Sequence, residues 1–133
     1  STPKPSSAAS DVYKRQQVFR HLPESLESGN DQVVAGLFNQ PETIVAWLGT
    51  WRARLHQIDR NKALALMRRT NPVFIPRNHR IEEAIQAGNS GDFTLFRQLH
   101  QILQNPFTEQ TEFTEYEAPP TPAEVVRETF CGT

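Results

Sequence analysis

Hydrophobic positions recur at helical spacing through the middle of the chain, roughly over residues 33–107. The clearest pattern follows Pro41, a residue type favoured in the first turn of a helix. Its apolar positions fall three or four residues apart and form one continuous stripe: Ile44, Trp47, Leu48, Trp51, Leu55 and Ile58. This spacing predicts an amphipathic helix that buries the stripe against a core.

Other helices are expected before and after that stripe. Phe19 and Leu22 indicate the end of a helix before Pro23, because proline breaks the hydrogen-bond pattern of a helix interior. Asn30 and Asp59 are residue types that cap helix N-termini, and each precedes a run with helical spacing. We therefore predict helices that begin just after residues 30 and 59.

The C-terminal half contains two more helical patterns. Asn78 is placed to cap a short helix that ends at Gly88, since glycine often terminates helices. Gly91 and Asp92 then form a turn and cap, and the last pattern ends before Pro106. These two helices are close together in sequence, so we expect them to pack as antiparallel neighbours.

Pro72 and Pro76 interrupt the helical pattern over residues 71–77. The apolar residues between them, Val73, Phe74 and Ile75, are predicted to be extended and to act as an apolar plug rather than a paired strand. No stretch alternates convincingly with period two. The expected fold class is all-α, with short antiparallel helices, an extended proline-containing plug at 71–77 and a disordered acidic tail.

Composition divides the chain into three parts. Residues 1–17 are predicted to be disordered, residues 18–107 to form the helical region, and residues 108–133 to be an acidic, largely extended tail ending in Cys-Gly-Thr. One helical turn is expected at Val125 and Val126. Residues 11–16 read DVYKRQ, which resembles a translated sequencing-library adapter. That peptide is either such a scar, replacing the native upstream sequence, or an ordinary basic tail.

The charge pattern argues against two classes of function. The net charge is −1, and no apolar run approaches the roughly 18 residues that span a bilayer, so we expect no nucleic-acid partner and no membrane. Eight cations between residues 52 and 80 are opposed within that stretch only by Asp59. Such a stretch can bind phosphates, but we favour a solvated or interdomain face that meets acidic groups elsewhere.

No residue pattern predicts a catalytic, cofactor-binding or metal-binding site. The four histidines, His21, His56, His79 and His100, lack zinc-ligand spacing and are expected on the surface or on helix faces. The single cysteine, Cys131, cannot form an internal disulfide. It is either incidental or reacts with a group outside this chain, which makes it a redox candidate.

Three blocks of sequence resemble one family. They are WLGTWRARL at 47–55, MRRTNPVFIPRNH at 67–79 followed by EEAI at 82–85 and GDF at 91–93, and TFCGT at 129–133. Together they resemble the C-terminal quarter of the selenoprotein O (SelO, YdiU-type) family over about residues 30–133. Cys131 matches the family's C-terminal selenocysteine or cysteine, which is thought to be a redox partner of a thiol in the catalytic domain.

The resemblance implies a kinase-like (pseudokinase) parent protein that transfers AMP from ATP, bound with Mg²⁺, to Ser, Thr or Tyr of target proteins. Its ATP and Mg²⁺ ligands would lie upstream of residue 1, so the segment itself is expected to be inactive. Its implied partners are the kinase-like lobe in cis and the protein substrates of the parent, in the bacterial cytoplasm. The alternative is a free-standing helical protein-interaction module.

Overall fold

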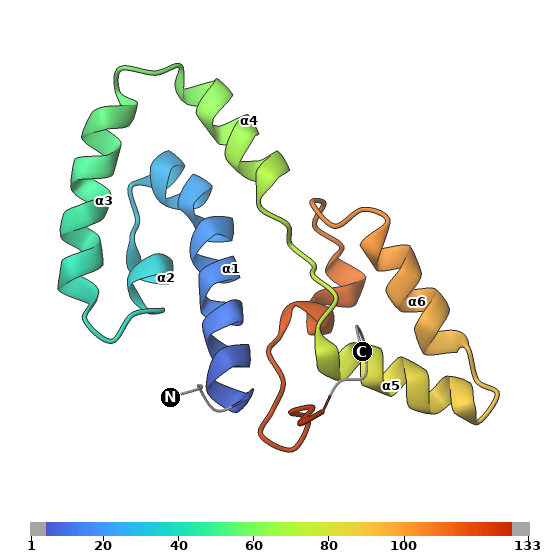
Figure 1. Cartoon of the computed structure of the whole chain (residues 1–133). Coiled ribbons are helices and arrows are strands. Elements are labelled where there is room, and N and C mark those ends of the chain that lie inside the picture. Colours follow the sequence, from blue (N-terminus) through green and yellow to red (C-terminus); the bar gives the residue numbers. More distant parts are fainter. Residues whose placement is uncertain (1–4, 129–133) are drawn as a thin grey trace. The chain divides into compact units, whose positions relative to one another are not determined.

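The computed structural model describes the backbone of residues 5–128 and the side chains of residues 11–128. Within that range every regular element is helical and no strand occurs, which confirms the all-α class (Figure 1). The elements are α1 (Pro5–Ser28), α2 (Gln32–Ala35), α3 (Pro41–Leu55), α4 (Arg60–Thr70), α5 (Asn78–Asn89), α6 (Thr94–Leu103) and the 3-10 helix η1 (Thr111–Glu117).

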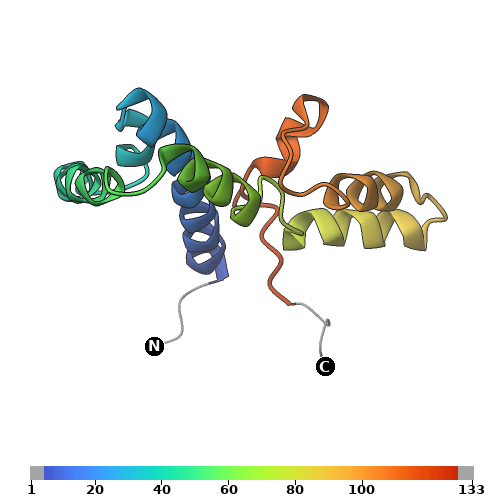
Figure 2. The ribbon, with the colours of Figure 1, turned by 90° about the horizontal axis from the view of Figure 1, so that it is seen from above.

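The described residues form two compact units, each with its own hydrophobic cluster. One unit is Lys14–Pro72, and the other contains the described residues up to Tyr13 and those from Val73 onward. In the second unit, α5 and α6 lie side by side as an antiparallel pair, as expected from the sequence (Figures 1 and 2).

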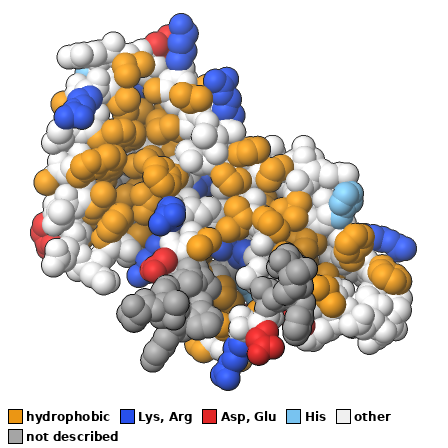
Figure 3. Space-filling view, in the orientation of Figure 1, with side chains coloured by type: hydrophobic (Ala, Val, Ile, Leu, Met, Phe, Trp, Pro, Cys, Tyr) orange, Lys and Arg blue, Asp and Glu red, His pale blue; other side chains and the backbone are white. Residues whose placement is uncertain are grey.

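The core of the 14–72 unit joins α1, α2 and α3. Its buried residues are Leu22, Val34 and Leu48, and Val18, Ile44, Trp51 and Met67 pack against them. Figure 3 shows hydrophobic side chains gathered over α2 and the facing sides of α1 and α3. Burying this apolar surface is the main source of stability for such a unit.

Helix α1 differs from the sequence prediction in two ways. It begins at Pro5, within a segment predicted to be disordered, and it continues through Pro23 instead of ending there. Leu22 and Ser25, on either side of that proline, are both buried. Because tertiary packing contributes more to helix stability than local propensity does, these contacts outweigh the missing N–H of Pro23.

Helix α3 begins at Pro41 as predicted, but it buries only part of its apolar stripe. Leu48 is fully buried, whereas Trp47 is 50% exposed. Ile58 is 57% exposed and lies beyond the helix end at Leu55. The stripe is therefore wider than the face that α3 packs against the core.

The predicted caps are correct at residue 59 and displaced by one residue elsewhere. The Asp59 carboxylate accepts hydrogen bonds from the backbone N–H groups of Asn61 and Lys62. Asp31, not Asn30, is the N-cap of α2, although the Asn30 side chain accepts a bond from the Gln32 N–H. Similarly, Asn78 is the first residue of α5 rather than its cap. Such offsets are common at helix ends.

The plug predicted at 71–77 lies outside any helix or strand, and its residues from Val73 onward belong to the second unit. Val73 and Phe74 are buried there, in a cluster with Ile102 and Tyr116. Their backbone N–H groups both donate to the Pro106 carbonyl, at 2.8 and 3.1 Å. This shared acceptor joins the plug to the end of α6.

The tail prediction is wrong over residues 111–117, which form η1 instead of extended or disordered chain. Tyr116 is buried, its ring meets Phe113 edge to face, and its hydroxyl donates to the Gln98 side chain at 2.9 Å. The two aromatic residues are three positions apart, so one helical turn brings both to the core, while Glu112 and Glu115 are exposed.

Candidate functional site

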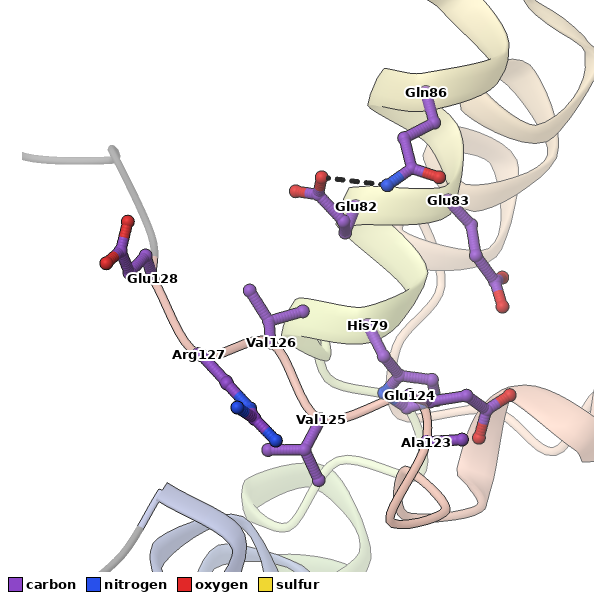
Figure 4. Close-up of a pocket in the computed structure, with 10 residues that line it drawn as sticks. All are labelled: His79, Glu82, Glu83, Gln86, Ala123, Glu124, Val125, Val126, Arg127 and Glu128. Atoms are coloured by element: carbon purple, nitrogen blue, oxygen red, sulfur yellow. Dashed lines mark hydrogen bonds between the residues drawn. The ribbon is translucent and has the colours of Figure 1, made fainter.

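The candidate site is a cavity of about 400 Å³ between the first half of α5 and the segment 123–128 (Figure 4). Both parts belong to the same compact unit. The lining is mainly polar, and it consists of His79, Glu82, Glu83 and Gln86 from α5 and of the six consecutive residues Ala123, Glu124, Val125, Val126, Arg127 and Glu128.

A turn at residues 121–124 holds the segment in place. The Thr121 N–H donates to the Glu124 carboxylate at 2.7 Å, and the Glu124 N–H donates to the Thr121 carbonyl at 2.9 Å. These two bonds resemble the reciprocal pattern of a helix capping box, but the chain leaves the turn after Glu124. The helical turn predicted at Val125 and Val126 is therefore absent. The hydrogen bonds from Thr121 lower the pKa of Glu124, so this carboxylate is ionised at neutral pH.

His79 is the buried side chain of the site, with 4% of its surface exposed. Burial lowers its pKa, and the nearby Arg80 cation lowers it further, against the opposing effect of Glu124 and Glu83. Both causes disfavour the charged ring, so His79 is neutral at pH 7. His79 thus lies on a helix, as one predicted alternative has it, but it is not at the surface, because the segment after residue 120 covers the start of α5.

The other histidines fit the prediction of a surface or helix-face location. His21 contacts Glu24 and Gln17 on its own helix, His56 is exposed, and the His100 ring stacks on Phe96. None of them lines the cavity. No sequence signal separates His79 from these three, since its burial depends on chain more than forty residues away.

The carboxylates of α5 already have partners. Glu82 accepts a bond of 3.1 Å from the Gln86 side chain, and Glu83 pairs with Arg80 at 3.0 Å. Among residues 11–128, no group of three or more His, Cys, Asp or Glu side chains could hold a metal ion. The cavity can therefore accept polar groups, but it does not have the ligand set of a metal centre.

Two arginines of the predicted basic face are structural. Arg77 is buried and donates to the Glu117 carbonyl at 2.9 Å, and Arg80 donates to the Glu115 carbonyl at 3.0 Å. The Arg80 guanidinium also lies 5.0 Å from the centre of the Tyr116 ring, a cation–π geometry. Burial lowers the pKa of Arg77. These hydrogen bonds hold η1 against the start of α5, in the same unit as the cavity.

Several cations between residues 52 and 68 also have partners inside their own unit. Arg52 donates to Asp31 and Ser25, and Arg68 pairs with Glu27. Arg60 donates to the carbonyls of Leu26 and Glu27 near the C-terminus of α1, where a helix favours positive charge. Arg60 and Arg68 nevertheless remain exposed, as expected for a solvated face, whereas Arg52 is only partly exposed.

Cys131, the redox candidate, lies outside the described residues. Glu128, the last described residue, lines the cavity.

Comparisons with known proteins give one consistent result. The chain is 44% identical over 118 residues to a protein of Bradyrhizobium sp. strain BTAi1 called protein nucleotidyltransferase YdiU. The matched stretch covers 86% of this chain and 24% of that protein. The protein of the same name from Jannaschia sp. strain CCS1 is 45% identical over 88% of this chain and 24% of its own length. The one from Rhizobium johnstonii is 48% identical over 74% of this chain and 20% of its own length. No family model matches. The chain thus spans about a quarter of the length of these relatives.

Proposed function

We propose that this chain is the C-terminal helical segment of a protein nucleotidyltransferase of the YdiU type. The premise is that the chain is homologous to about a quarter of the length of those proteins. The observation that carries the proposal is the identity of 44–48% over most of the chain. The three sequence blocks at 47–55, 67–79 and 129–133 support the C-terminal position.

The whole protein would transfer AMP from ATP to Ser, Thr or Tyr hydroxyls of target proteins. In phosphoryl-type transfer the protein positions the reacting groups and neutralises phosphate charge. ATP would bind together with Mg²⁺ in the whole protein, and among residues 11–128 no group of three or more His, Cys, Asp or Glu side chains could hold a metal ion. Their sites would lie in a kinase-like lobe formed by the part of the relatives that this chain does not match.

The role of this segment would be structural. Its two hydrophobic clusters and the arginine contacts to η1 are internal supports. We infer that the segment braces the kinase-like lobe in cis and is inactive alone. The protein acts in the bacterial cytoplasm in this proposal, and none of the described helices has the length and hydrophobicity to cross a membrane.

Deletion in an intact relative tests the bracing role. Removing the residues equivalent to 30–107 from the Bradyrhizobium protein should lower its melting temperature and abolish AMP transfer, measured with labelled ATP and a generic protein acceptor. A deletion variant with unchanged stability and full AMP transfer would refute the proposal.

Cys131 would regulate the enzyme through its redox state. In this proposal its thiol and a thiol of the catalytic lobe form a disulfide, and a peroxide-class oxidant accepts the two electrons and two protons released. A cysteine reacts as the thiolate, so its reactivity depends on where the tail docks. Alkylation of the equivalent cysteine in an intact relative should remove the effect of oxidant on AMP transfer. An unchanged response would make Cys131 incidental.

A free-standing helical interaction module is the second candidate. It is favoured by one observation, that each compact unit has a hydrophobic cluster of its own among the described residues. The upstream genomic DNA distinguishes the two candidates. A continuous reading frame that encodes a kinase-like ATP site supports the enzyme, and a start codon near Val18 supports the module.

A further inference from the structure

The middle of α3 carries no charge on any side. Residues 43–51 are nine consecutive uncharged residues, which exceed two turns of an α-helix. A helix with one solvated side normally places charged residues there, whereas a helix that is apolar all round is usually buried all round. Among the described contacts, however, Leu48 is the only buried residue of α3.

The uncovered part of this stretch is large and open. Trp47 is 50% exposed and Val45 is 42% exposed. A Cβ built on Gly49 meets no atom within 4 Å. The Trp47 ring stacks on Trp51 with centroids 5.9 Å apart, so it is held in a defined position. We call the exposed residues of this stretch the outer face of α3: Val45, Ala46, Trp47, Gly49 and Thr50.

The charges nearest to this face lie at its ends or turn away from it. Arg52, the first charged residue after the stretch, donates to Ser25 and Asp31 within its own unit. Glu42 and Arg54 are exposed near the two ends of α3. An apolar centre with charged residues at the margin is the usual anatomy of a protein interface.

We propose that the outer face of α3 is the docking surface for the part of the same polypeptide that corresponds to the other three quarters of the YdiU proteins. The inference rests on the proposed function. This chain covers only 24% of its relatives, so most of the homologous polypeptide lies outside the structure. Docking within one polypeptide benefits from a high effective concentration, so a single helix face is sufficient.

The chemistry of the face specifies the surface that it meets. Ala46 and Gly49 are small and permit close approach of another helix, while Trp47 beside them requires an apolar recess. Large apolar surfaces are rarely left in water on a soluble protein. The docking partner is therefore an apolar helical surface with a pocket for one aromatic ring.

The test uses a fusion in which this chain replaces the matched segment of the Bradyrhizobium protein. The variant Gly49→Arg adds a long charged side chain to the outer face. Arginine is a better helix former than glycine, and nothing lies near this position in the 14–72 unit, so the helix itself gains stability. A loss of stability in the fusion must then come from a surface that covers Gly49.

We expect Gly49→Arg to lower the melting temperature of the fusion by about 2 °C or more, since overpacking an interface costs about 1–3 kcal/mol and each kcal/mol shifts the melting temperature of a 150–250-residue domain by about 2–4 °C. The matched control is Leu66→Arg, which adds the same side chain to an exposed position of α4 and should leave the melting temperature unchanged. Trp47 should also become less accessible to acrylamide in the fusion than in the isolated chain.

Three results would overturn the proposal. They are an unchanged melting temperature for the Gly49→Arg fusion, an equal loss in the Leu66→Arg control, and concentration-dependent dimerisation of the isolated chain that Gly49→Arg abolishes. The last result would assign the face to a second copy. AMP transfer by the unmutated fusion is measured separately, so failure of the proposed activity is distinguishable from failure of docking.

Discussion

Replacing Leu48 with alanine is the most direct test of the core of the 14–72 unit. Leu48 is fully buried in a cluster with Leu22 of α1 and Val34 of α2, against which Ile44 and Trp51 of α3 also pack. Most of α3 is otherwise exposed, so few neighbouring contacts can compensate for its loss. We expect this one substitution to loosen the attachment of the whole helix.

The size of the effect follows from the atoms removed. Leucine to alanine deletes three carbon atoms, worth about 2.4 kcal/mol in transfer free energy at about 0.8 kcal/mol per methylene. The cavity left behind raises the loss to about 3–4 kcal/mol. Natural domains have only about 5–15 kcal/mol of stability in total, and small units lie at the low end. The variant should therefore be close to unfolding at room temperature.

Urea denaturation followed by tryptophan fluorescence measures this loss, because Trp51 packs against the same cluster. With a slope of about 2 kcal/mol per molar urea, the midpoint should fall by about 1.5–2 M. Leu66→Ala is the control, since this leucine is 51% exposed and its truncation should cost less than about 0.5 kcal/mol. Equal midpoints for the two variants would show that α3 does not pack through Leu48.

Three further predictions concern pH, a helix cap and a turn. Burial lowers the pKa of His79 below its ordinary value of 6.5, so the stability that the neutral ring contributes is present above pH 6.5 and is lost as the pH falls from there to the folded-state pKa. Urea midpoints at pH 7.5 and 5.0 should therefore differ less in His79→Gln than in His100→Gln. An equal difference in the two variants would contradict the assignment. Asp59→Ala should cost about 1 kcal/mol in thermal melts followed by circular dichroism, whereas Asp59→Asn, which can still cap α4, should cost little; equal losses would mean that the cap is not the cause. Gly91→Ala should cost about 1–2 kcal/mol because Gly91 has φ = 88°, although no atom would crowd the added Cβ. Gly88→Ala, by contrast, should be neutral or stabilising. The reverse order of the two urea midpoints would refute the turn geometry.

Local signals in the sequence were sufficient for α3, for α4 and for the break in helical structure at 71–77. Pro41, Asp59 and the proline pair at residues 72 and 76 act through their own backbone chemistry, which requires no knowledge of the rest of the fold. That is why α3 and α4 begin where they were predicted and residues 73–75 lie outside any helix, although α3 ends at Leu55, three residues before Ile58.

Features that depend on distant chain were not predictable in this way. Pro23 lies inside α1 because residues on either side of it are buried, and His79 is buried because the segment 123–128 covers it. Trp47 was assigned to the core from its helical position, but α3 packs on only one side within the described residues. Periodicity identifies an apolar stripe, and it does not specify which part of a wide stripe the present contacts cover.

The carbonyl of Pro106, which accepts bonds from both Val73 and Phe74, has a consequence for how this region can vary. The two ends of the α5–α6 excursion meet at that single oxygen, so residues 75–105 begin and end at the same point. Adding a matched turn to both helices would lengthen the excursion without moving its ends, at a loop-closure cost that grows only logarithmically with length. We therefore expect natural length variation of this region to concentrate near Gly91, at the far end of the hairpin, while the spacing around residues 73 and 106 stays fixed.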